Sequence, residues 1–316
     1  GVYHSPDTAL RDMIYISDMV GVRSLAIAHP DSNLFPIDGF WQTLNQLKPE
    51  AARLMQYGPI QGDTLLRAVL AEQYAEHGIN TSPDNIFITT GVMQGLSLVS
   101  QALTEPGDHV LVDSPTFLGT LNMLRAQRLI AVGVPLDDEG PHLPTLERLV
   151  QQHRPKFYYA IPNFQNPTGI CMSLARRQAL INLAEKYDFW LVDDDIYGRL
   201  AYEDGPPPTL RALRDRRTIY LDGFSKALMP GLRTGVIVAP PSLNHALNRL
   251  RRATDLCGPT FMQRALALFL RDGGLKRHLR RAIPHYRQQR DALVNAMRRH
   301  FPSDARWHYP RGGFCC

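Results

Sequence analysis

Residues 218–227 read TIYLDGFSKA, a β-branched run that leads through an Asp-Gly pair into Ser225 and Lys226. The run predicts a buried strand over 218–221, which places Lys226 just beyond its carboxyl end. A lysine at this depth is costly as an isolated charge unless its pKa falls or its amine forms an imine. Schiff-base chemistry uses that neutral amine. Downstream, Arg233 can grip a phosphate through two parallel N–H bonds, and the Ser225 hydroxyl adds a donor.

The rest of the sequence places this strand in a sheet with several others. From about residue 85, short β-branched runs alternate with longer amphipathic runs, the pattern of βαβ units and of a mainly parallel sheet. Helices are predicted over 173–187 and 62–78, and in a long basic stretch after Leu275 that Pro284 interrupts. The other predicted strands are 86–89, 109–112, 129–134, 156–161, 189–192 and 235–239.

Composition narrows the class of protein. The 316 residues suffice for one large α/β domain with a smaller partner. Hydrophobic residues make up 44%, and no apolar run approaches the roughly 18 residues that cross a bilayer, so we expect a soluble protein without a membrane partner. The start shows no secretory signal, and the four cysteines have no metal-ligand spacing. A reducing, cytoplasmic compartment fits this cysteine usage best.

The formal charge of +5 suits a phosphorylated ligand without requiring nucleic acid. Much of the basic excess falls late in the chain, at helical spacing. We expect these side chains to form a solvated face. They are Arg249, Arg251, Arg252, Lys276, Arg277, Arg280, Arg281, Arg298 and Arg299.

Further polar segments follow other predicted strands. Ligands of an open parallel sheet bind beyond the carboxyl ends of its strands. Residues 90–94, TGVMQ, form a glycine turn before a helix, whose free N–H groups and dipole favour a phosphate. Residues 163–169, NFQNPTG, fix the direction of the Asn166 amide through the proline that follows, although this segment also fits a plain turn.

Residues 193–197, DDDIY, put three carboxylates at one strand end. Adjacent like charges destabilise a fold unless cations accompany them. A metal ion is one such cation, but no histidine lies nearby in the sequence. A ligand cation such as a protonated pyridine nitrogen would also make one buried aspartate favourable.

Taken in order, these segments resemble the fold-type I pyridoxal-5′-phosphate (PLP) enzymes, specifically the class I/II aminotransferases. The resemblance covers nearly the whole chain, from about Leu34 to Phe314. It rests on three segments that are jointly specific. They are Asn166-Pro167-Thr168-Gly169, Asp194-x-x-Tyr197, and Ser225-Lys226 followed by Pro230-Gly231-Leu232-Arg233.

The resemblance implies an α/β fold: a three-layer, mainly parallel sheet of the aspartate aminotransferase type, with a smaller α+β domain. Residues 1–44 would form an N-terminal arm and part of the small domain. Residues 45–275 would form the large PLP-binding domain. Residues 276–316 would begin a C-terminal small domain that is incomplete.

The resemblance also implies catalytic roles. Lys226 would form the internal aldimine and, once released by substrate, act as general base and acid of the 1,3-proton shift. Asp194 would keep the pyridine nitrogen protonated. Tyr197, together with Asn166, would bond the phenolic oxygen of the ring. Lys226, Asp194 and Tyr197 are thus the implied catalytic residues, and no metal is implied.

The remaining implied roles concern binding of the cofactor. Its phosphate would contact Ser225, Arg233 and the N–H groups at the start of a helix. Phe117 matches the aromatic residue that stacks on the ring, and Tyr57 matches a tyrosine that reaches the phosphate of the partner subunit, which implies a homodimer with shared sites. The implied cofactor-binding residues are Val92, Met93, Phe117, Asn166, Asp194, Tyr197, Ser225, Lys226, Arg233 and Tyr57.

The sequence departs from the family pattern at three points. Gly223 stands where the family often has a serine, so one phosphate donor is absent. Residues 28–30, AHP, replace the common G-x-P at which substrate carboxylate contacts are made. The family's substrate-carboxylate arginine lies beyond Gly313, past the end of the chain.

The first function implied is an aminotransferase that moves an amino group between an L-amino acid and a 2-oxo acid. Residues 163–169 and 194–197 look like the branch that handles 2-aminoadipate, kynurenine, or aromatic and branched amino acids. The second is the PLP-binding effector domain of a GntR/MocR-type regulator, with DNA as a partner only if a winged helix-turn-helix precedes Gly1. A decarboxylase or lyase would keep the same cofactor residues.

Other enzyme classes fit the sequence less well. Residues 223–227, GFSKA, nearly match the G-x-S-x-G nucleophile elbow of hydrolases but lack its final glycine. No G-x-G-x-x-G follows a predicted strand, and no P-loop sequence is present. A dinucleotide enzyme and a nucleoside triphosphatase are therefore disfavoured.

Overall fold

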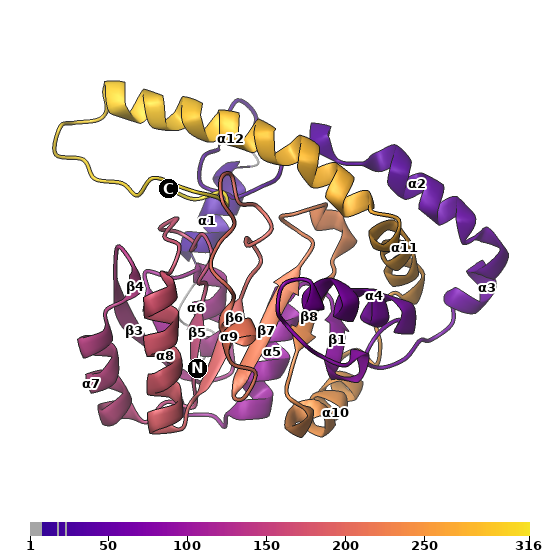
Figure 1. The fold of residues 1–316 in the computed structure, drawn as a ribbon, viewed down its shortest axis with the longest axis horizontal. Coiled ribbons are helices and arrows are strands. Elements are labelled where there is room, and N and C mark those ends of the chain that lie inside the picture. The colour runs from indigo at the N-terminus through magenta and orange to yellow at the C-terminus, as the bar shows by residue number, and fades with distance from the viewer. Residues whose placement is uncertain (1–7, 18, 23) are drawn as a thin grey trace.

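The computed structural model describes residues 8–17, 19–22 and 24–316. Within them an eight-stranded sheet has the order β1-β8-β7-β6-β5-β2-β3-β4 (Figure 1). The neighbours from β7 through β6, β5 and β2 to β3 are parallel, whereas β8 is antiparallel to both β1 and β7, and β4 is antiparallel to β3. The strands are β1 Ile86–Thr89, β2 His109–Ser114, β3 Ile130–Asp137, β4 Gly140–Pro141, β5 Phe157–Ala160, β6 Trp190–Asp194, β7 Thr218–Gly223 and β8 Gly235–Val238.

Every strand predicted from the sequence overlaps one of these strands, which confirms the mainly parallel α/β fold. The two-residue β4 was not predicted, because two residues carry no readable period. β8 turns antiparallel because only a short loop and a 3-10 turn at Pro230–Leu232 separate it from β7. A parallel connection needs a longer crossover.

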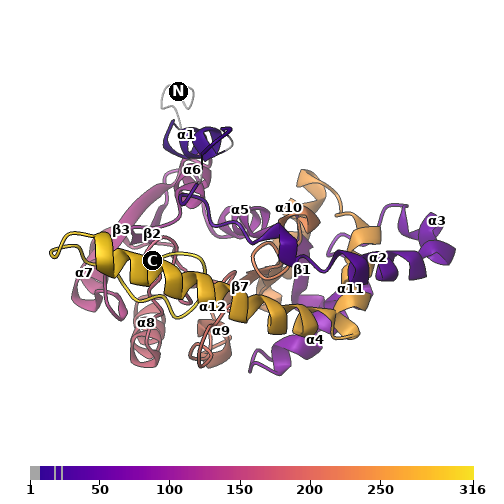
Figure 2. The same ribbon diagram turned by 90° about the horizontal axis from the view of Figure 1, so that it is seen from above.

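Helices cover both faces of the sheet and produce three layers (Figure 2). Val110 and Val112 of β2 join a core with Leu96 of α5, whereas Leu111 joins a separate core with Leu180 of α8. This alternation follows the two-residue period of a strand. The helices are α1 Thr8–Ser17, α2 Ile37–Gln46, α3 Ala51–Leu54, α4 Thr64–Ala75, α5 Val92–Leu103, α6 Leu118–Ala126, α7 Leu143–His153, α8 Leu174–Tyr187, α9 Leu210–Leu213, α10 Asn244–Thr254, α11 Thr260–Arg271 and α12 Gly274–His300.

Two of the predicted helices begin at side chains that cap them. The Asp63 carboxylate accepts a hydrogen bond from the Leu66 N–H at 3.0 Å and opens α4. The Ser173 hydroxyl accepts from the Arg176 N–H at 3.2 Å and opens α8. Both caps satisfy first-turn N–H groups that lack intrahelical acceptors.

α12 corrects one prediction, because it runs unbroken through Pro284. Pro284 lies on the exposed side of the helix, and so does Arg280, whose carbonyl loses its helical donor there and can bind water instead. The opposite side is held by the buried Ala282 and Tyr286. Figure 1 shows α12 crossing the molecule above the sheet. None of the described helices is long and apolar enough to span a membrane.

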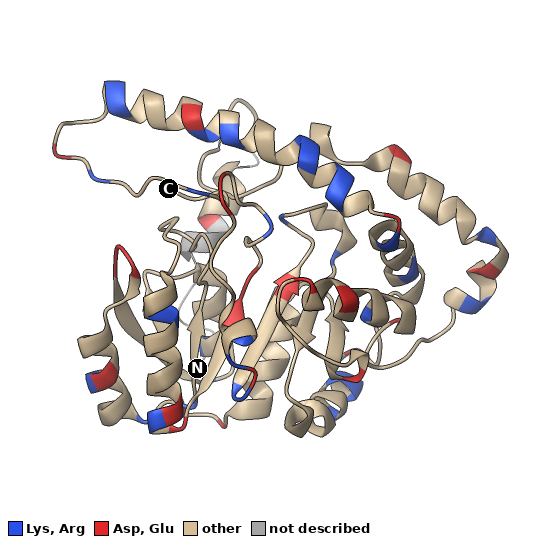
Figure 3. Ribbon diagram, viewed as in Figure 1, with Lys and Arg blue, Asp and Glu red and all other residues tan. Residues whose placement is uncertain are grey.

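A second correction concerns the late basic residues. Most of them are exposed on α10 and α12. Figure 3 marks the basic positions along α12 in blue. Arg251 is the exception, with only 1% of its surface exposed. Helical spacing could not reveal this, because Arg251 lies in the last turn of α10, where the helix packs on α5.

The C-terminal segment returns from α12 to the sheet. The Gly313 N–H donates to the Leu200 carbonyl oxygen at 3.0 Å, and the Tyr202 hydroxyl donates to the Gly313 carbonyl oxygen. Arg290 of α12 donates to the carbonyl of Pro310. These bonds hold Phe314 next to the loop that follows β6.

Candidate active site

Lys226 follows β7 at the carboxyl end of the sheet, as the sequence predicted. β7 ends at Gly223, and Lys226 is half-buried beyond it. Its Nζ donates a hydrogen bond to the Ala28 carbonyl oxygen at 2.6 Å. Burial lowers the pKa of the Lys226 amine, and Cys315 opposes this shift. The amine is therefore biased toward the neutral form that can attack an aldehyde.

Asp194 ends the neighbouring strand β6 at the same edge, because it pairs in register with Leu221 of β7. The Tyr159 hydroxyl donates to Asp194 Oδ2 at 2.6 Å, and the Ile196 N–H donates to Oδ1 at 3.3 Å. Burial raises the pKa of Asp194 to about 7, although the Tyr159 bond opposes the rise. A cation beside this carboxylate would favour its ionised form, so Asp194 suits a protonated ring nitrogen.

The two flanking aspartates point to different partners. Asp193 Oδ2 accepts from the Arg211 N–H at 3.0 Å, while its Oδ1 has no partner in the described part of the chain. Asp195 accepts from Asn163 Nδ2 at 2.5 Å and from the Tyr220 hydroxyl at 2.9 Å. The alternation of side chains thus separates Asp194 from Asp193 and Asp195, which lie two residues apart on the other side of the chain. No cluster of His, Cys, Asp and Glu suited to a metal occurs among the described residues.

Asn166 and Tyr197 are brought together from separate loops. Asn166 Nδ2 donates to the Tyr197 hydroxyl oxygen at 3.3 Å. Tyr197 is buried, and burial raises the pKa of its hydroxyl. The Phe314 ring meets the Tyr197 ring edge-on, with centroids 6.3 Å apart. This pair can present two hydrogen-bonding groups to one ligand oxygen.

The turn before α5 forms a cradle for an anion. Gly91 has a φ of 81°, which favours glycine, and α5 begins at Val92. The first N–H groups of such a helix point out of its end without intrahelical acceptors. A Cβ at Gly91 would lie 3.1 Å from Arg233 Nη2. A glycine backbone, a helix N-terminus and a guanidinium thus meet at one place and fit a phosphate.

Gly223 has a steric reason for lacking a side chain. A Cβ there would lie 2.8 Å from Val92 Cγ2. The valine at the start of α5 therefore fills the space into which a serine at position 223 would project. The loss of a phosphate donor at position 223 remains a prediction.

For three predicted cofactor-binding residues, the single chain shows position and exposure but no side-chain hydrogen bond to another predicted site residue within its described part. Phe117 follows β2, is half-buried and occupies the N-cap position of α6 without a side-chain capping bond. Ser225 is half-buried beside Lys226. Tyr57 lies between α3 and α4 and is 83% exposed, so its predicted contact with a partner subunit remains a prediction.

Sequence reasoning missed Tyr159 and the contact of Phe314 with Tyr197. Tyr159 belongs to β5, one residue after Tyr158, whose hydroxyl donates to Asp113. Both tyrosines looked like ordinary strand residues. A polar hydroxyl inside a strand buried on both faces was the available signal, because it requires a partner.

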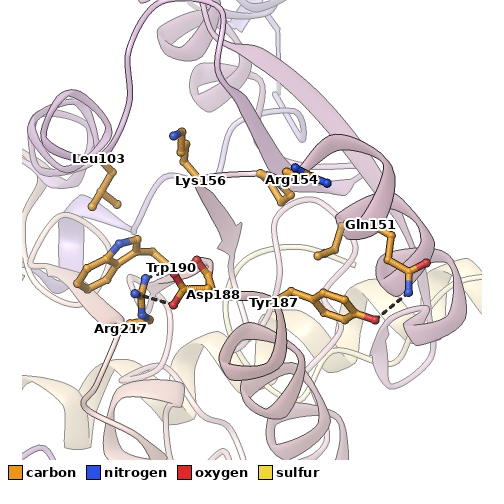
Figure 4. Close-up of a pocket in the computed structure, with 10 residues that line it drawn as sticks. Leu103, Gln151, Arg154, Lys156, Tyr187, Asp188, Trp190 and Arg217 are labelled. Carbon is orange, nitrogen blue, oxygen red and sulfur yellow. Dashed lines mark hydrogen bonds and ion pairs between the residues drawn. The ribbon is translucent and has the colours of Figure 1, made fainter.

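A depression of about 580 Å³ opens at the opposite, amino-terminal edge of the sheet (Figure 4). Lys156 before β5 and Trp190 at the start of β6 line it. Arg217 lies over the Trp190 ring at 5.4 Å and pairs with Asp188 at 2.6 Å. None of the predicted cofactor-binding residues lines this depression.

Comparison with known proteins identifies the family of the chain. Residues 27–316 match the profile of a family described as aminotransferase class I and II. This chain belongs to that family. The cofactor of class I and II aminotransferases is PLP, and the chain is a PLP-dependent aminotransferase with the aspartate aminotransferase-like fold.

Named relatives of this aminotransferase cover most of its length. It is 36% identical to aromatic-amino-acid aminotransferase 1 of Thermococcus litoralis, over 96% of this chain and 75% of that protein. A crystal structure of Pyrococcus horikoshii kynurenine aminotransferase, in complex with PMP, superposes with a TM-score of 0.93 at 33% identity, covering 98% and 78% of the two chains. The uncharacterised HTH-type transcriptional regulator YdcR of Escherichia coli is 33% identical, over 98% of this chain and 66% of that protein.

Proposed function

We propose that this aminotransferase moves the amino group of an L-amino acid to a 2-oxo acid, with Lys226 as the residue that holds the cofactor and moves the proton. The observation that carries the assignment is the Lys226 amine itself. It is half-buried, its pKa is lowered, and it leaves the sheet at the same edge as Asp194. Bound PLP supplies an electron sink for the α-carbon of the substrate.

The other residues would bind and orient the cofactor. Asp194, fixed by Tyr159, would face the ring nitrogen and keep it protonated. Asn166 and Tyr197 would bond the ring oxygen, since they already contact each other at 3.3 Å. Arg233, together with the Val92 and Met93 N–H groups, would bind the phosphate, and Phe117 would cover one face of the ring.

The substrate is proposed to be an aromatic amino acid or another with a long side chain, such as 2-aminoadipate or kynurenine. The names of the Thermococcus and Pyrococcus relatives support this class. A homodimer in which Tyr57 reaches the partner's site is part of the proposal, and its 83% exposure leaves it available for such a contact. So is a cytoplasmic location, in keeping with four cysteines that are all free.

A second candidate function is the cofactor-binding domain of a transcription regulator. The match to YdcR over 98% of this chain favours it. Such a domain would keep every residue named above and bind PLP in the same place. The two functions differ in turnover and in DNA binding, not in the cofactor site.

A spectral half-reaction separates these candidates. The PLP-loaded protein is mixed with a panel of single amino acids, and conversion of the bound aldehyde to the pyridoxamine form is followed by absorbance. An aminotransferase should convert fully with a preferred amino acid and revert when a 2-oxo acid is added. A protein that binds PLP but is converted by no amino acid would contradict the proposal and favour the regulator.

A further inference from the structure

Arg251 is buried where its neighbours are exposed. Only 1% of its surface is accessible, whereas Arg249 and Arg252 on the same helix face the solvent. A buried guanidinium destabilises a protein unless it is paired and hydrogen-bonded. Its partners therefore indicate what the residue is for.

Those partners join three separate elements. Arg251 Nη1 donates to the Ile88 carbonyl oxygen of β1 at 2.7 Å and to Gln94 Oε1 of α5 at 3.1 Å. Arg251 Nε forms an ion pair with Asp255 Oδ1 at 2.6 Å. Gln94 Nε2 donates to Asp255 Oδ2 at 2.8 Å. Arg251, Asp255 and Gln94 thus form a closed ring of polar contacts.

The ring fixes the direction of the Gln94 amide. Asp255 can only accept, so the amide nitrogen must face it, and the amide oxygen must face Arg251. That oxygen also accepts a hydrogen bond from the Thr90 N–H at 2.7 Å. Gln94 is the third residue of α5, and its side chain reaches back past the N-cap residue Gly91 to Thr90, one position further than in a capping box.

The bond to Thr90 holds the turn that presents the phosphate cradle. Thr90 and Gly91 lead directly into Val92, where α5 begins. On the other side of this turn, Arg233 Nη2 lies 3.5 Å from the Thr90 carbonyl oxygen. Moving Thr90 would therefore redirect both the first N–H groups of α5 and the guanidinium beside them.

We propose that Arg251 and Asp255 are positioning residues for the phosphate of the cofactor. They lock Gln94, and Gln94 locks the turn whose N–H groups bind the phosphate. The inference rests on the proposed function, because the phosphate is that of PLP held at Lys226. Neither Arg251 nor Asp255 is placed in contact with the cofactor. Their loss should weaken binding of the phosphate without affecting binding of the cofactor's pyridine ring.

Comparing PLP with pyridoxal separates an effect on phosphate binding from an effect on binding of the pyridine ring, because pyridoxal is the same aldehyde without its phosphate. Dissociation constants of both are measured from the visible absorbance of the Lys226-bound form in the wild type and in the Gln94→Met, Arg251→Met and Arg252→Met variants. In the first two variants the dissociation constant for PLP should rise about tenfold, and that for pyridoxal should stay within about twofold. Arg252→Met, the exposed neighbour, should change neither.

Either of two results would overturn the inference. Equal weakening of PLP binding and pyridoxal binding would mean that the polar ring of Arg251, Asp255 and Gln94 merely stabilises the fold. Unchanged PLP binding would mean that this polar ring has no role in the site. If Arg251→Met does not fold, Asp255→Asn tests the same ring at a partly exposed side chain. Its amide nitrogen would face that of Gln94, or its oxygen would leave Arg251, and either arrangement disturbs the ring.

Measurements on the wild-type protein distinguish failure of the positioning role from failure of the proposed function. If it attaches neither PLP nor pyridoxal at Lys226, the proposed function is wrong. If it attaches both, and the variants keep the wild-type ratio of the two constants, only the positioning role is wrong.

Discussion

At the scale of the residue, Lys226 combines chemistry and position. Its amine lies beyond β7, hydrogen-bonded only to the Ala28 carbonyl oxygen among the described residues, and burial lowers its pKa. A carbonyl oxygen accepts a hydrogen bond without supplying a negative charge. The amine is thus held in place while its neutral form remains accessible.

Replacing this amine should abolish covalent attachment of the cofactor without unfolding the protein. Lys226→Ala is expected to lose the visible absorbance of bound PLP and the mass increase seen after borohydride reduction. Lys276→Ala, at an exposed position of α12, should keep both. Borohydride-trapped PLP on the Lys226→Ala variant would show that another lysine holds the cofactor.

Asp193 predicts a dependence of stability on pH. Burial, followed by the nearby Asp195, raises the pKa of Asp193 to about 7. The folded protein therefore binds this proton more tightly than the unfolded chain, and the resulting stability is lost as the pH rises from about 4 through 7. In Asp193→Asn this loss is absent, so the variant should gain up to about 4 kcal/mol relative to wild type between pH 4 and pH 8.

Chemical denaturation of the cofactor-free protein at a series of pH values measures this difference. Asp204→Asn, at an exposed position, serves as the control and should follow the wild-type curve. Parallel curves for wild type and Asp193→Asn would show that Asp193 titrates normally.

At the scale of the element, the close approach of β8 to the start of α5 shapes the phosphate cradle. Gly235 of β8 has no room for a side chain, because a Cβ there would lie 2.4 Å from the Gly91 carbonyl carbon and 2.6 Å from the Val92 nitrogen. Both contacts are to backbone, which cannot rotate away. The strand and the helix therefore fix each other's positions.

Gly235→Ala should displace this turn. We expect a loss of about 1 to 3 kcal/mol in the free energy of unfolding, from overpacking, together with weaker PLP binding. Gly231→Ala is the matched control, because nothing lies within 4 Å of a Cβ there, and it should stay within about 0.5 kcal/mol of wild type. Equal stabilities of the two variants would mean that the turn can move without cost.

At the scale of the whole molecule, the proposed homodimer would place Tyr57 in the partner's site. Loss of its hydroxyl should then raise the dissociation constant for PLP about tenfold, as for a hydrogen bond to a charged group. Tyr57→Phe isolates that hydroxyl, and equilibrium sedimentation reports the oligomeric state. Unchanged PLP affinity in a dimeric Tyr57→Phe protein would remove Tyr57 from the site.

Hybrid dimers provide a second check of the shared site. A dimer of one Tyr57→Phe subunit and one Lys226→Ala subunit has one site with both native residues and one with neither. Such hybrids should bind one equivalent of PLP with wild-type affinity. If each subunit keeps its own Tyr57, every site of the hybrid is defective. The division into an arm, a large domain and a C-terminal domain remains a prediction at this scale.

The sequence by itself predicted seven of the eight described strands, several of the helices and the residues proposed to carry the chemistry. These features depend on local patterns, such as the period of β2 or the glycine turn before α5, which neighbouring residues impose on one another. Lys226 could be found because its strand and its loop are contiguous in the chain. The same holds for Asp194 at the end of β6.

Only the tertiary structure decided which distant groups meet. The Tyr159 contact with Asp194, the inward turn of Arg251 and the unbroken course of α12 through Pro284 all depend on packing between elements far apart in the chain. The local pattern around Arg251 is that of a solvated helix. Its burial follows from where α10 lies against α5, and a sequence period carries no information about that position.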